Sequence, residues 1–144
     1  MTPEERKQAI EDHIRTDPFA AFLGAELEAV DEGYSRVSLV VTEAMLNFHG
    51  ITHGGLVFSL GDIGFAAASN SRGQTAVALN VTTSFLSATR AGDHLVAEVT
   101  EQHAAGPIAT YAIVVTERQS GRLVAQSQAM VYRRKEFFVP PDEV

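Results

Sequence analysis

The sequence predicts an α+β domain in which an antiparallel sheet covers one central helix. Strand-like segments with turn signals lie on both sides of a single long apolar segment, and the later segments are joined by short connections. The apolar segment runs from Gly54 to Ser71 and carries one charged residue, Asp62. The chain has 144 residues, the usual length of one domain, so we expect a single domain over residues 1–144.

Two elements are expected before the apolar segment. Residues 1–23 form a predicted N-terminal helical extension, because Thr2, Pro3 and Glu5 have the pattern of a capped helix start. Apolar and polar residues then alternate over residues 25–42, with a turn in the middle of the segment. This alternation predicts a half-buried β-hairpin.

Four segments rich in β-branched and aromatic residues predict four more strands after the apolar segment. They span approximately residues 75–86, 95–101, 108–117 and 123–133. The turns between them are short, which predicts an antiparallel meander. The last residues, 134–144, include two adjacent prolines and are expected to form an irregular tail.

Composition and charge argue against several classes of function. The chain has no cysteine, which removes cysteine nucleophiles, thiolate zinc sites and iron–sulfur clusters. A formal net charge of −7 argues against nucleic acid as a partner. A membrane span is not expected, because a carboxylate such as Asp62 costs at least about 2.5 kcal/mol at the centre of a bilayer. The charged first residues do not have the pattern of a secretory signal, so we expect a cytoplasmic location.

The start of the apolar segment has the features of a helix terminus that binds an oxyanion. Gly54 and Gly55 let a ligand approach the backbone closely, and the first N–H groups of a helix have no intrahelical partners. Together with the positive end of the helix dipole, these donors stabilise a carbonyl oxygen that becomes negative during a reaction. The alternative is a plain glycine-rich turn into a helix.

Asp62 is the second chemical feature of the segment. An ionised Asp in an apolar helix is costly unless it is paired, solvated or used, and no Lys or Arg lies within one helical turn. We expect a catalytic carboxylate that faces a cleft. The alternative is a structural Asp that accepts hydrogen bonds from nearby backbone or hydroxyl groups.

The spacing of these two features predicts an oligomer. Asp62 lies eight residues after Gly54, which is about 12 Å along a helix axis. One chain therefore cannot bring both groups to the same carbonyl. Two antiparallel helices across a twofold axis can, so we expect an obligate dimer with sites shared between the subunits.

The segment from Asn47 to Gly73 resembles a known family. The similarity rests on Asn47, His49-Gly50, His53-Gly54-Gly55, Phe58-Ser59-Leu60, Asp62 and Asn70-Ser71-Arg72-Gly73. These residues closely resemble those of the hotdog-fold acyl-CoA thioesterases, in particular the phenylacetate-degradation (PaaI-like) branch. The resemblance extends from about Gly24 to Tyr132. It implies a long helix wrapped by an antiparallel sheet, pairing into dimers or dimers of dimers, and hydrolysis of aryl- or acyl-CoA thioesters with no metal and no separate cofactor.

The resemblance also implies roles for individual residues. Asp62 is similar to the general base or nucleophile, Gly54 and Gly55 to the oxyanion-binding helix start, and Asn47 to the amide that orients water or substrate. His53 is similar to a histidine that shapes the loop and contacts the thioester, so it is counted with the catalytic residues. Substrate contacts are expected from His49, Phe48, Leu56, Phe58, Phe65, Ser84 and Arg90, of which the three phenylalanines and the leucine are candidates to line the acyl pocket.

One departure from the family pattern concerns the CoA phosphates. Ser87 and Ala88 stand where the family commonly has a basic residue and a proline. Arg90, three positions after Ser87, is therefore the candidate to supply the positive charge.

Other chemistries fit the sequence less well. His49 and His53 are four residues apart, but Gly50 and Gly54 interrupt the segment, so a helical zinc site is not expected. A hotdog hydratase or dehydratase is an alternative, although such relatives carry a proline beside the loop glycine and this loop has none. A non-catalytic acyl-CoA-binding dimer is expected to lack Asp62 or Asn47, and both residues are present.

Overall fold

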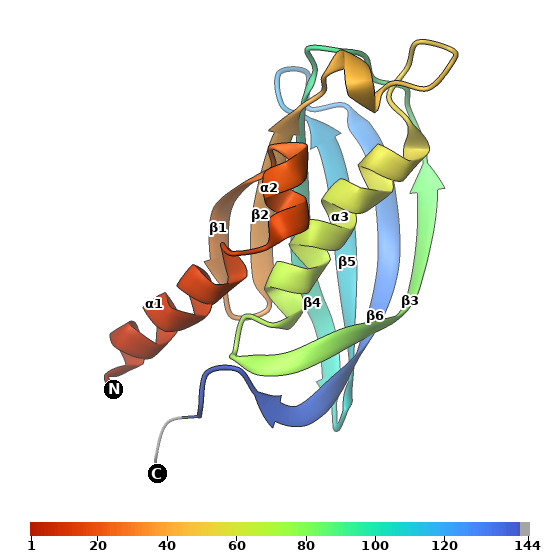
Figure 1. Ribbon diagram of the computed structural model, residues 1–144. Helices are drawn as coiled ribbons and strands as arrows, with labels where there is room; N and C mark the ends of the chain where they lie inside the picture. Colours follow the sequence, from red (N-terminus) through yellow and green to blue (C-terminus); the bar gives the residue numbers. More distant parts are fainter. Residues whose placement is uncertain (142–144) are drawn as a thin grey trace.

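The long helix α3 lies across a curved antiparallel sheet in the computed structural model, which describes residues 1–141 (Figure 1). The predicted α+β architecture is therefore confirmed. The helices are α1 (Pro3–Ile14), α2 (Pro18–Leu23), the short 3-10 helix η1 (Glu43–Met45) and α3 (Gly54–Ser69). The strands are β1 (Glu26–Asp31), β2 (Tyr34–Val40), β3 (Gln74–Phe85), β4 (His94–Ala105), β5 (Ile108–Glu117) and β6 (Leu123–Phe137).

The order of the strands departs from the expected meander. Over the described residues the sheet has six strands in the order β1-β2-β4-β5-β6-β3, so of the four strands after α3 only β4, β5 and β6 follow one another as neighbours. Strand β3 pairs with β6 and lies at an edge, which closes the sheet around α3 on the side opposite β1 (Figure 1). Short connections could not reveal this pairing, because β3 and β6 are distant in the sequence.

The face of α3 that meets the sheet is apolar and buried. Leu60 and Ala68 have no exposed surface, and Phe65 is 1% exposed. The ring of Phe65 packs edge-on against Tyr111 of β5, with ring centroids 5.6 Å apart. Contacts of this kind contribute the hydrophobic free energy that holds the helix on the sheet.

Gly61 and Gly64 allow α3 to approach the sheet closely. A Cβ atom at Gly61 would lie 3.1 Å from Ile113 Cγ2, and one at Gly64 would lie 3.0 Å from Val99 Cγ2. The Ser35 hydroxyl donates a hydrogen bond of 2.6 Å to the carbonyl of Gly64. These glycines therefore accommodate the sheet, on the face of the helix that lies away from Asp62.

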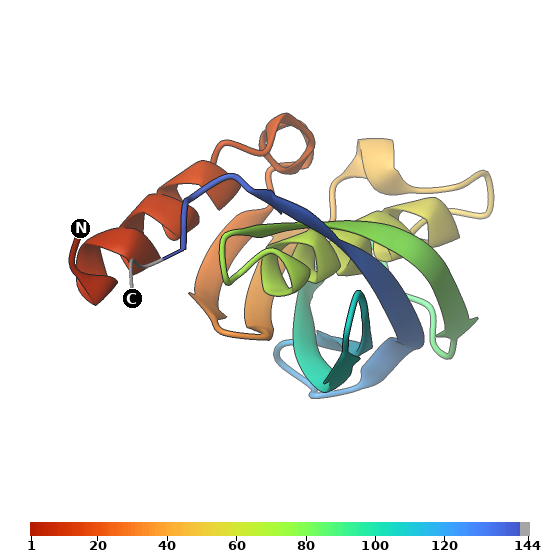
Figure 2. The same cartoon turned by 90° about the horizontal axis from the view of Figure 1, so that it is seen from below.

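The N-terminal extension contains two helices, which lie beside α3 and β1 (Figure 2). Thr2 and Glu5 cap α1 reciprocally: each side chain accepts the other residue's backbone N–H at 3.1 Å. Asp17 caps α2 by accepting the N–H of Phe19 at 3.0 Å and that of Ala20 at 3.3 Å.

The prediction of an irregular tail over residues 134–144 is wrong for the first residues of that range. Strand β6 continues to Phe137, which pairs with Gln74, because β3 offers backbone partners that the local sequence does not reveal. The rest of the tail is held near α1, where the Arg6 guanidinium donates to the carbonyls of Arg72 and Pro140 at 2.7 and 2.8 Å. Residues 142–144 lie outside the described residues. None of the helices within residues 1–141 has the length and apolar character needed to cross a membrane.

Replacing Gly64 with alanine should destabilise the fold. The added methyl group meets Val99 and Ser35 in the core at 3.0 and 3.3 Å, so overpacking of about 1–3 kcal/mol outweighs the gain of up to about 1 kcal/mol in helix propensity. We expect Gly64→Ala to lower the free energy of unfolding by about 1–2 kcal/mol in urea titrations. Ser59→Ala, on the outer side of the same helix, is the control and should change it by less than about 0.5 kcal/mol. Equal stability of Gly64→Ala and the parent protein would contradict the close packing.

Candidate active site

The start of α3 is fixed by His53, which acts as the N-cap. Its Nδ1 accepts the N–H of Gly55 at 2.9 Å, and its carbonyl accepts the N–H groups of Leu56 and Val57. The N–H of Gly54 finds no acceptor within the described chain. Of the two glycines expected to bind an oxyanion, Gly54 therefore has its donor free, whereas the donor of Gly55 is already used by His53. The sequence could not separate them, because the choice depends on the orientation of the imidazole.

The loop before α3 is shaped by Asn47. Its side-chain oxygen accepts the N–H of His49 at 2.9 Å and that of Ile51 at 3.4 Å, and its backbone exchanges hydrogen bonds with Ile51 and Gly50. The loop is anchored at its end by the buried Thr52, whose hydroxyl accepts a hydrogen bond of 2.7 Å from Thr89. The side-chain N–H₂ of Asn47 remains available to a ligand, since no acceptor for it occurs within residues 1–141.

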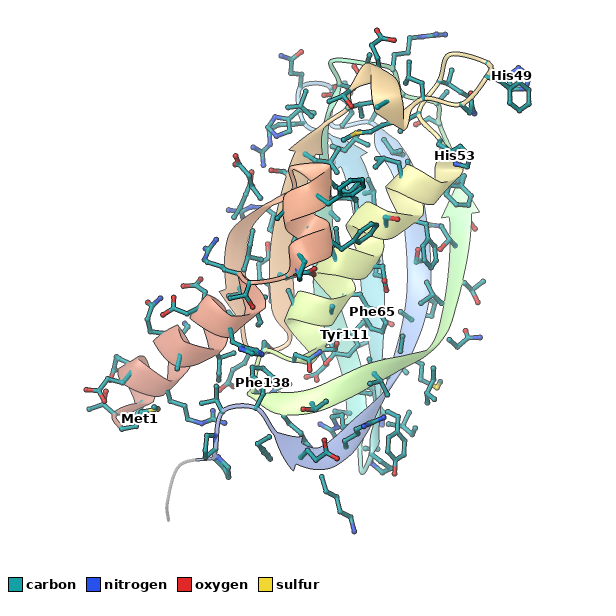
Figure 3. The ribbon with its side chains drawn as sticks, viewed as in Figure 1. Met1, His49, His53, Phe65, Tyr111 and Phe138 are labelled. Atoms are coloured by element: carbon teal, nitrogen blue, oxygen red, sulfur yellow. The ribbon has the colours of Figure 1, made fainter. Side chains whose placement is uncertain are left out.

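Phe48 and His49 lie at the projecting tip of this loop. Figure 3 shows His49 pointing away from the body of the chain, at the same end as His53. The two rings lie against each other, with centroids 4.2 Å apart, and Phe48 is 93% exposed.

Asp62 lies on the outer face of α3, opposite the sheet. It shares this uncovered face with Phe58 and Ala66, which are one turn before and one turn after it and are also exposed. No hydrogen bond to its carboxylate and no ion pair is found within the described residues. Within the single chain, Asp62 is therefore not a structural aspartate that neighbouring backbone or hydroxyl groups hold in place.

The electrostatic surroundings of Asp62 favour its protonated form. Partial desolvation of the carboxyl group raises its pKa above that of an ordinary aspartate, and the negative charge of Asp17 raises it further. Asp17 belongs to the N-terminal extension and was not among the sequence candidates. The carboxylate of Asp62 is consequently a stronger base than one in water.

The geometry within one chain separates the two chemical groups. Gly54 is the first residue of α3 and Asp62 is the ninth, so they are about 12 Å apart along the helix axis. A base must come within hydrogen-bonding distance of the water that attacks the carbonyl. Within one chain, the two groups therefore cannot act on the same carbonyl.

Two of the expected acyl-pocket residues are buried in the core of the single chain. Phe65 belongs to the core between α3 and β5, and Leu56 is 8% exposed and packs in the same core. In the single chain neither side chain has more than 8% of its surface exposed, and the ring of Phe65 is occupied by its contact with Tyr111. Phe58 is 40% exposed and lies on the uncovered face, so it remains a candidate.

Ser84 is directed away from α3. It lies in a shallow polar hollow on the outer face of the sheet, together with Thr82, Gln126 and Gln128. Its neighbour Phe85 faces the helix instead, with its ring 3.5 Å from where a Cβ of Gly54 would lie. Residues 84 and 85 must point to opposite faces of a strand, so alternation is the signal that could have identified Phe85.

The expected positive charge for CoA lies on an exposed loop near the start of α3. Arg90 follows Thr89, whose carbonyl accepts the N–H of Thr52 at 2.9 Å. A second arginine, Arg122, was not among the sequence candidates and lies beside this loop: its guanidinium donates to the Ser87 hydroxyl at 3.3 Å and to the Ala88 carbonyl at 3.0 Å. It comes from the turn before β6, which only the tertiary structure places beside this loop.

Metal ligands are not gathered in this region. Over residues 1–141, no set of three His, Asp or Glu side chains is close enough together to hold a metal ion. His49 and His53 are separated by the loop, with His53 engaged in capping α3.

Comparisons with known proteins identify the family. A model of the thioesterase superfamily matches residues 49–124. The matched range includes the end of the loop that follows Asn47, the start of α3 and Asp62. The acyl-coenzyme A thioesterase PaaI of Escherichia coli is 41% identical over 103 residues, covering 72% of this chain and 74% of that protein.

Solved structures agree with this match. The E. coli PaaI protein from the phenylacetic acid degradation operon superposes with a TM-score of 0.88 at 33% identity, covering 94% of this chain and 99% of that one. A Streptococcus mutans protein solved with bound acetyl-CoA gives a TM-score of 0.73 at 25% identity, covering 76% and 88% of the two chains. The chain therefore belongs to the thioesterase superfamily, as a PaaI-like member with the hotdog fold.

Proposed function

We propose that this protein hydrolyses acyl-CoA thioesters to a free acid and CoA, in sites that two copies of the chain share. The observation that carries the proposal is the pair of unsatisfied groups on α3. One is the free N–H of Gly54 at the positive end of the helix, and the other is the unpaired carboxylate of Asp62 on its outer face.

A dimer is supported by two uncovered surfaces. Edge strand β3 carries exposed apolar side chains, with Val77, Leu79 and Phe85 each 39–56% exposed. A long apolar edge strand is a template for pairing with another strand. The outer face of α3 lies beside this edge. Pairing of two β3 strands across a twofold axis would set two α3 helices antiparallel, so that Asp62 of the partner subunit lies opposite Gly54.

The reaction follows from these groups. The thioester carbonyl oxygen accepts the N–H of Gly54, which stabilises the negative charge that develops there. Asp62 of the partner subunit takes a proton from a water molecule as that water attacks the carbonyl carbon. The C–S bond then breaks, and the departing CoA sulfur receives the proton. Direct attack by Asp62 to form an anhydride, which water then hydrolyses, is the alternative route.

The CoA part of the substrate needs positive charge for its phosphates, whereas the acyl group needs apolar contacts. The guanidinium groups of Arg90 and Arg122 lie on the loops at the start of α3 and suit the phosphates of CoA. We propose that the acyl group is aryl or phenylacetyl-like. This is supported by the exposed aromatic rings of Phe48 and Phe58, and by the phenylacetic acid degradation operon from which the E. coli relative comes.

Asp62→Asn should abolish turnover while leaving the fold intact. The amide keeps the shape of the side chain and cannot accept the proton from water, so we expect kcat to fall by about 10²–10⁴-fold. Because the raised pKa shows that ionised Asp62 is unfavourable in the folded chain, the melting temperature should be equal or higher. Hydrolysis of phenylacetyl-CoA, followed by release of free thiol, measures the first effect and calorimetry the second. Turnover within a factor of about two of the parent enzyme would reject the role of Asp62.

A subunit-mixing experiment tests whether the sites are shared. Gly54→Pro removes the amide N–H and keeps the helix start, because proline suits the first position of a helix and His53 already has an extended backbone with φ of −61° and ψ of 135°. A Cβ at this position makes only an ordinary contact with the ring of Phe85, at 3.5 Å. Asp62→Asn and Gly54→Pro should each be inactive alone. Co-expressed in equal amounts, they should regain about a quarter of the parent activity, since half of the dimers are mixed and each has one intact site. No recovery in verified mixed dimers would contradict a shared site.

Asp17→Asn should move the pH profile of the reaction. Removing the like charge favours the ionised form of Asp62 and lowers its pKa, so the acidic limb of kcat/KM should shift to lower pH. Asparagine still caps α2, which keeps the local structure. Asp12→Asn on α1, whose carboxylate accepts a hydrogen bond from Gln8, is the matched control and should leave the limb in place. An unmoved limb in Asp17→Asn would show that Asp17 does not act on the base.

A further inference from the structure

A large cavity lies between the N-terminal extension and the central helix. It has a volume of about 750 Å³ and is bounded by α1 and α2, by β1 and β2, and by α3. Figure 1 shows α2 beside α3, with α1 continuing away from it. Cavities of roughly 300–1,000 Å³ are the size that holds small organic ligands.

Most of the side chains that line this cavity are apolar. They come from every element around it: Ile14, Pro18, Ala20 and Ala21 from the extension, Leu27 and Val37 from the hairpin, and Ile63, Ala66 and Ala67 from α3. The wall therefore offers hydrophobic contacts from several elements, and Phe138, which follows β6, adds an aromatic ring to it.

Several of the polar residues in the lining are already engaged. The Arg15 guanidinium donates to the Leu27 carbonyl at 2.9 Å and lies 3.5 Å from Glu11. The Asp17 carboxylate accepts two backbone N–H groups of α2. The Asn70 amide pairs with the backbone of Ala66 and Ala76. With these groups engaged and the wall mostly apolar, an uncharged apolar group fits this cavity better than a phosphate or a carboxylate does, and the carboxylate of Glu26 in the same lining further disfavours an anion.

The cavity begins directly beside Asp62. Ile63 and Ala66, the next residue and the one a turn later, both line it. Ala66 is about 6 Å along the helix axis from Asp62. In the shared site, a thioester carbonyl placed opposite Asp62 has its acyl carbon chain free to continue along α3 toward this space. Asp17 also lines the cavity and acts on Asp62 through its charge, which places the two carboxylates near each other.

We propose that this cavity, here called the N-terminal cavity, receives the acyl group of the thioester and makes the enzyme selective for bulky apolar acyl groups of medium-chain or arylacyl size. This inference rests on the proposed function. It replaces Leu56 and Phe65, which are buried in the core, with walls built from the N-terminal extension. A small acyl group such as acetyl leaves most of the cavity empty and gains little from it.

The test is to fill the cavity from either wall and measure acyl selectivity. Ala21→Trp adds an indole from α2, and Ile14→Trp adds one from α1. Ala104→Trp, exposed on β4 and outside the cavity, is the matched control. Turnover of acetyl-, octanoyl- and phenylacetyl-CoA is measured for each variant. In parallel, calorimetry compares the affinity for S-octyl-CoA, a thioether that cannot be hydrolysed, with that for CoA alone.

The filled variants should lose bulky substrates selectively. We expect kcat/KM for octanoyl- and phenylacetyl-CoA to fall at least about tenfold, while that for acetyl-CoA changes by less than about twofold and confirms folding. The octyl group should also cease to add affinity over CoA, and Ala104→Trp should behave like the parent protein. Equal losses for all three substrates, or unchanged selectivity in both filled variants, would overturn the inference.

The thioether separates this inference from the proposed function. If the parent protein hydrolyses none of the three thioesters, the proposed function is refuted. The octyl contribution to binding then decides the cavity by itself: its loss in Ala21→Trp and Ile14→Trp supports occupation by the acyl group, and its persistence contradicts it.

Discussion

The close contact between α3 and the sheet is the constraint on which the rest of the structure depends. Gly61 and Gly64 bring the helix axis near β4 and β5, and Leu60 and Phe65 fill the space beside them. Because one face of the helix is fixed in this way, the opposite face must carry Asp62 outward. The same packing explains two helix-weakening glycines in an otherwise apolar segment, which the approach of a ligand does not.

The outward side of α3 carries two polar groups that have no hydrogen-bonding partner within the described part of a single chain. Gly54 has a free donor at the positive end of the helix and Asp62 an unpaired carboxylate nearly two and a half turns later. A helix is rigid, so no local movement joins them. Edge strand β3 carries exposed apolar side chains on which a second copy could pair. Under the proposed function, oligomerisation is therefore part of the chemistry.

The N-terminal extension connects to this chemistry through charge and through space. Asp17 holds the start of α2 and raises the pKa of Asp62, and the helices around it enclose the N-terminal cavity. The raised pKa of Asp62 is consistent with an apolar cavity beside it. The low polarity that suits an acyl group also disfavours the charged form of a carboxylate. In the proposed mechanism, the extension therefore acts on the base and on the acyl group as well as on stability.

The sequence by itself determined the α+β class, the position of the central helix, the hairpin and the presence of a glycine-capped start followed by a carboxylate. These features are local: they depend on periodicity, on turn residues and on spacing along one element. It also predicted that the two groups could not meet in one chain, since the rise of a helix is fixed. The tertiary structure decided what depends on distant partners. It placed β3 against β6, extended β6 to Phe137, gave the Gly55 donor to His53, turned Phe65 and Leu56 into the core and brought Asp17 and Arg122 to the site. No local pattern encodes these contacts, because each joins residues whose neighbourhood exists only after the chain has folded.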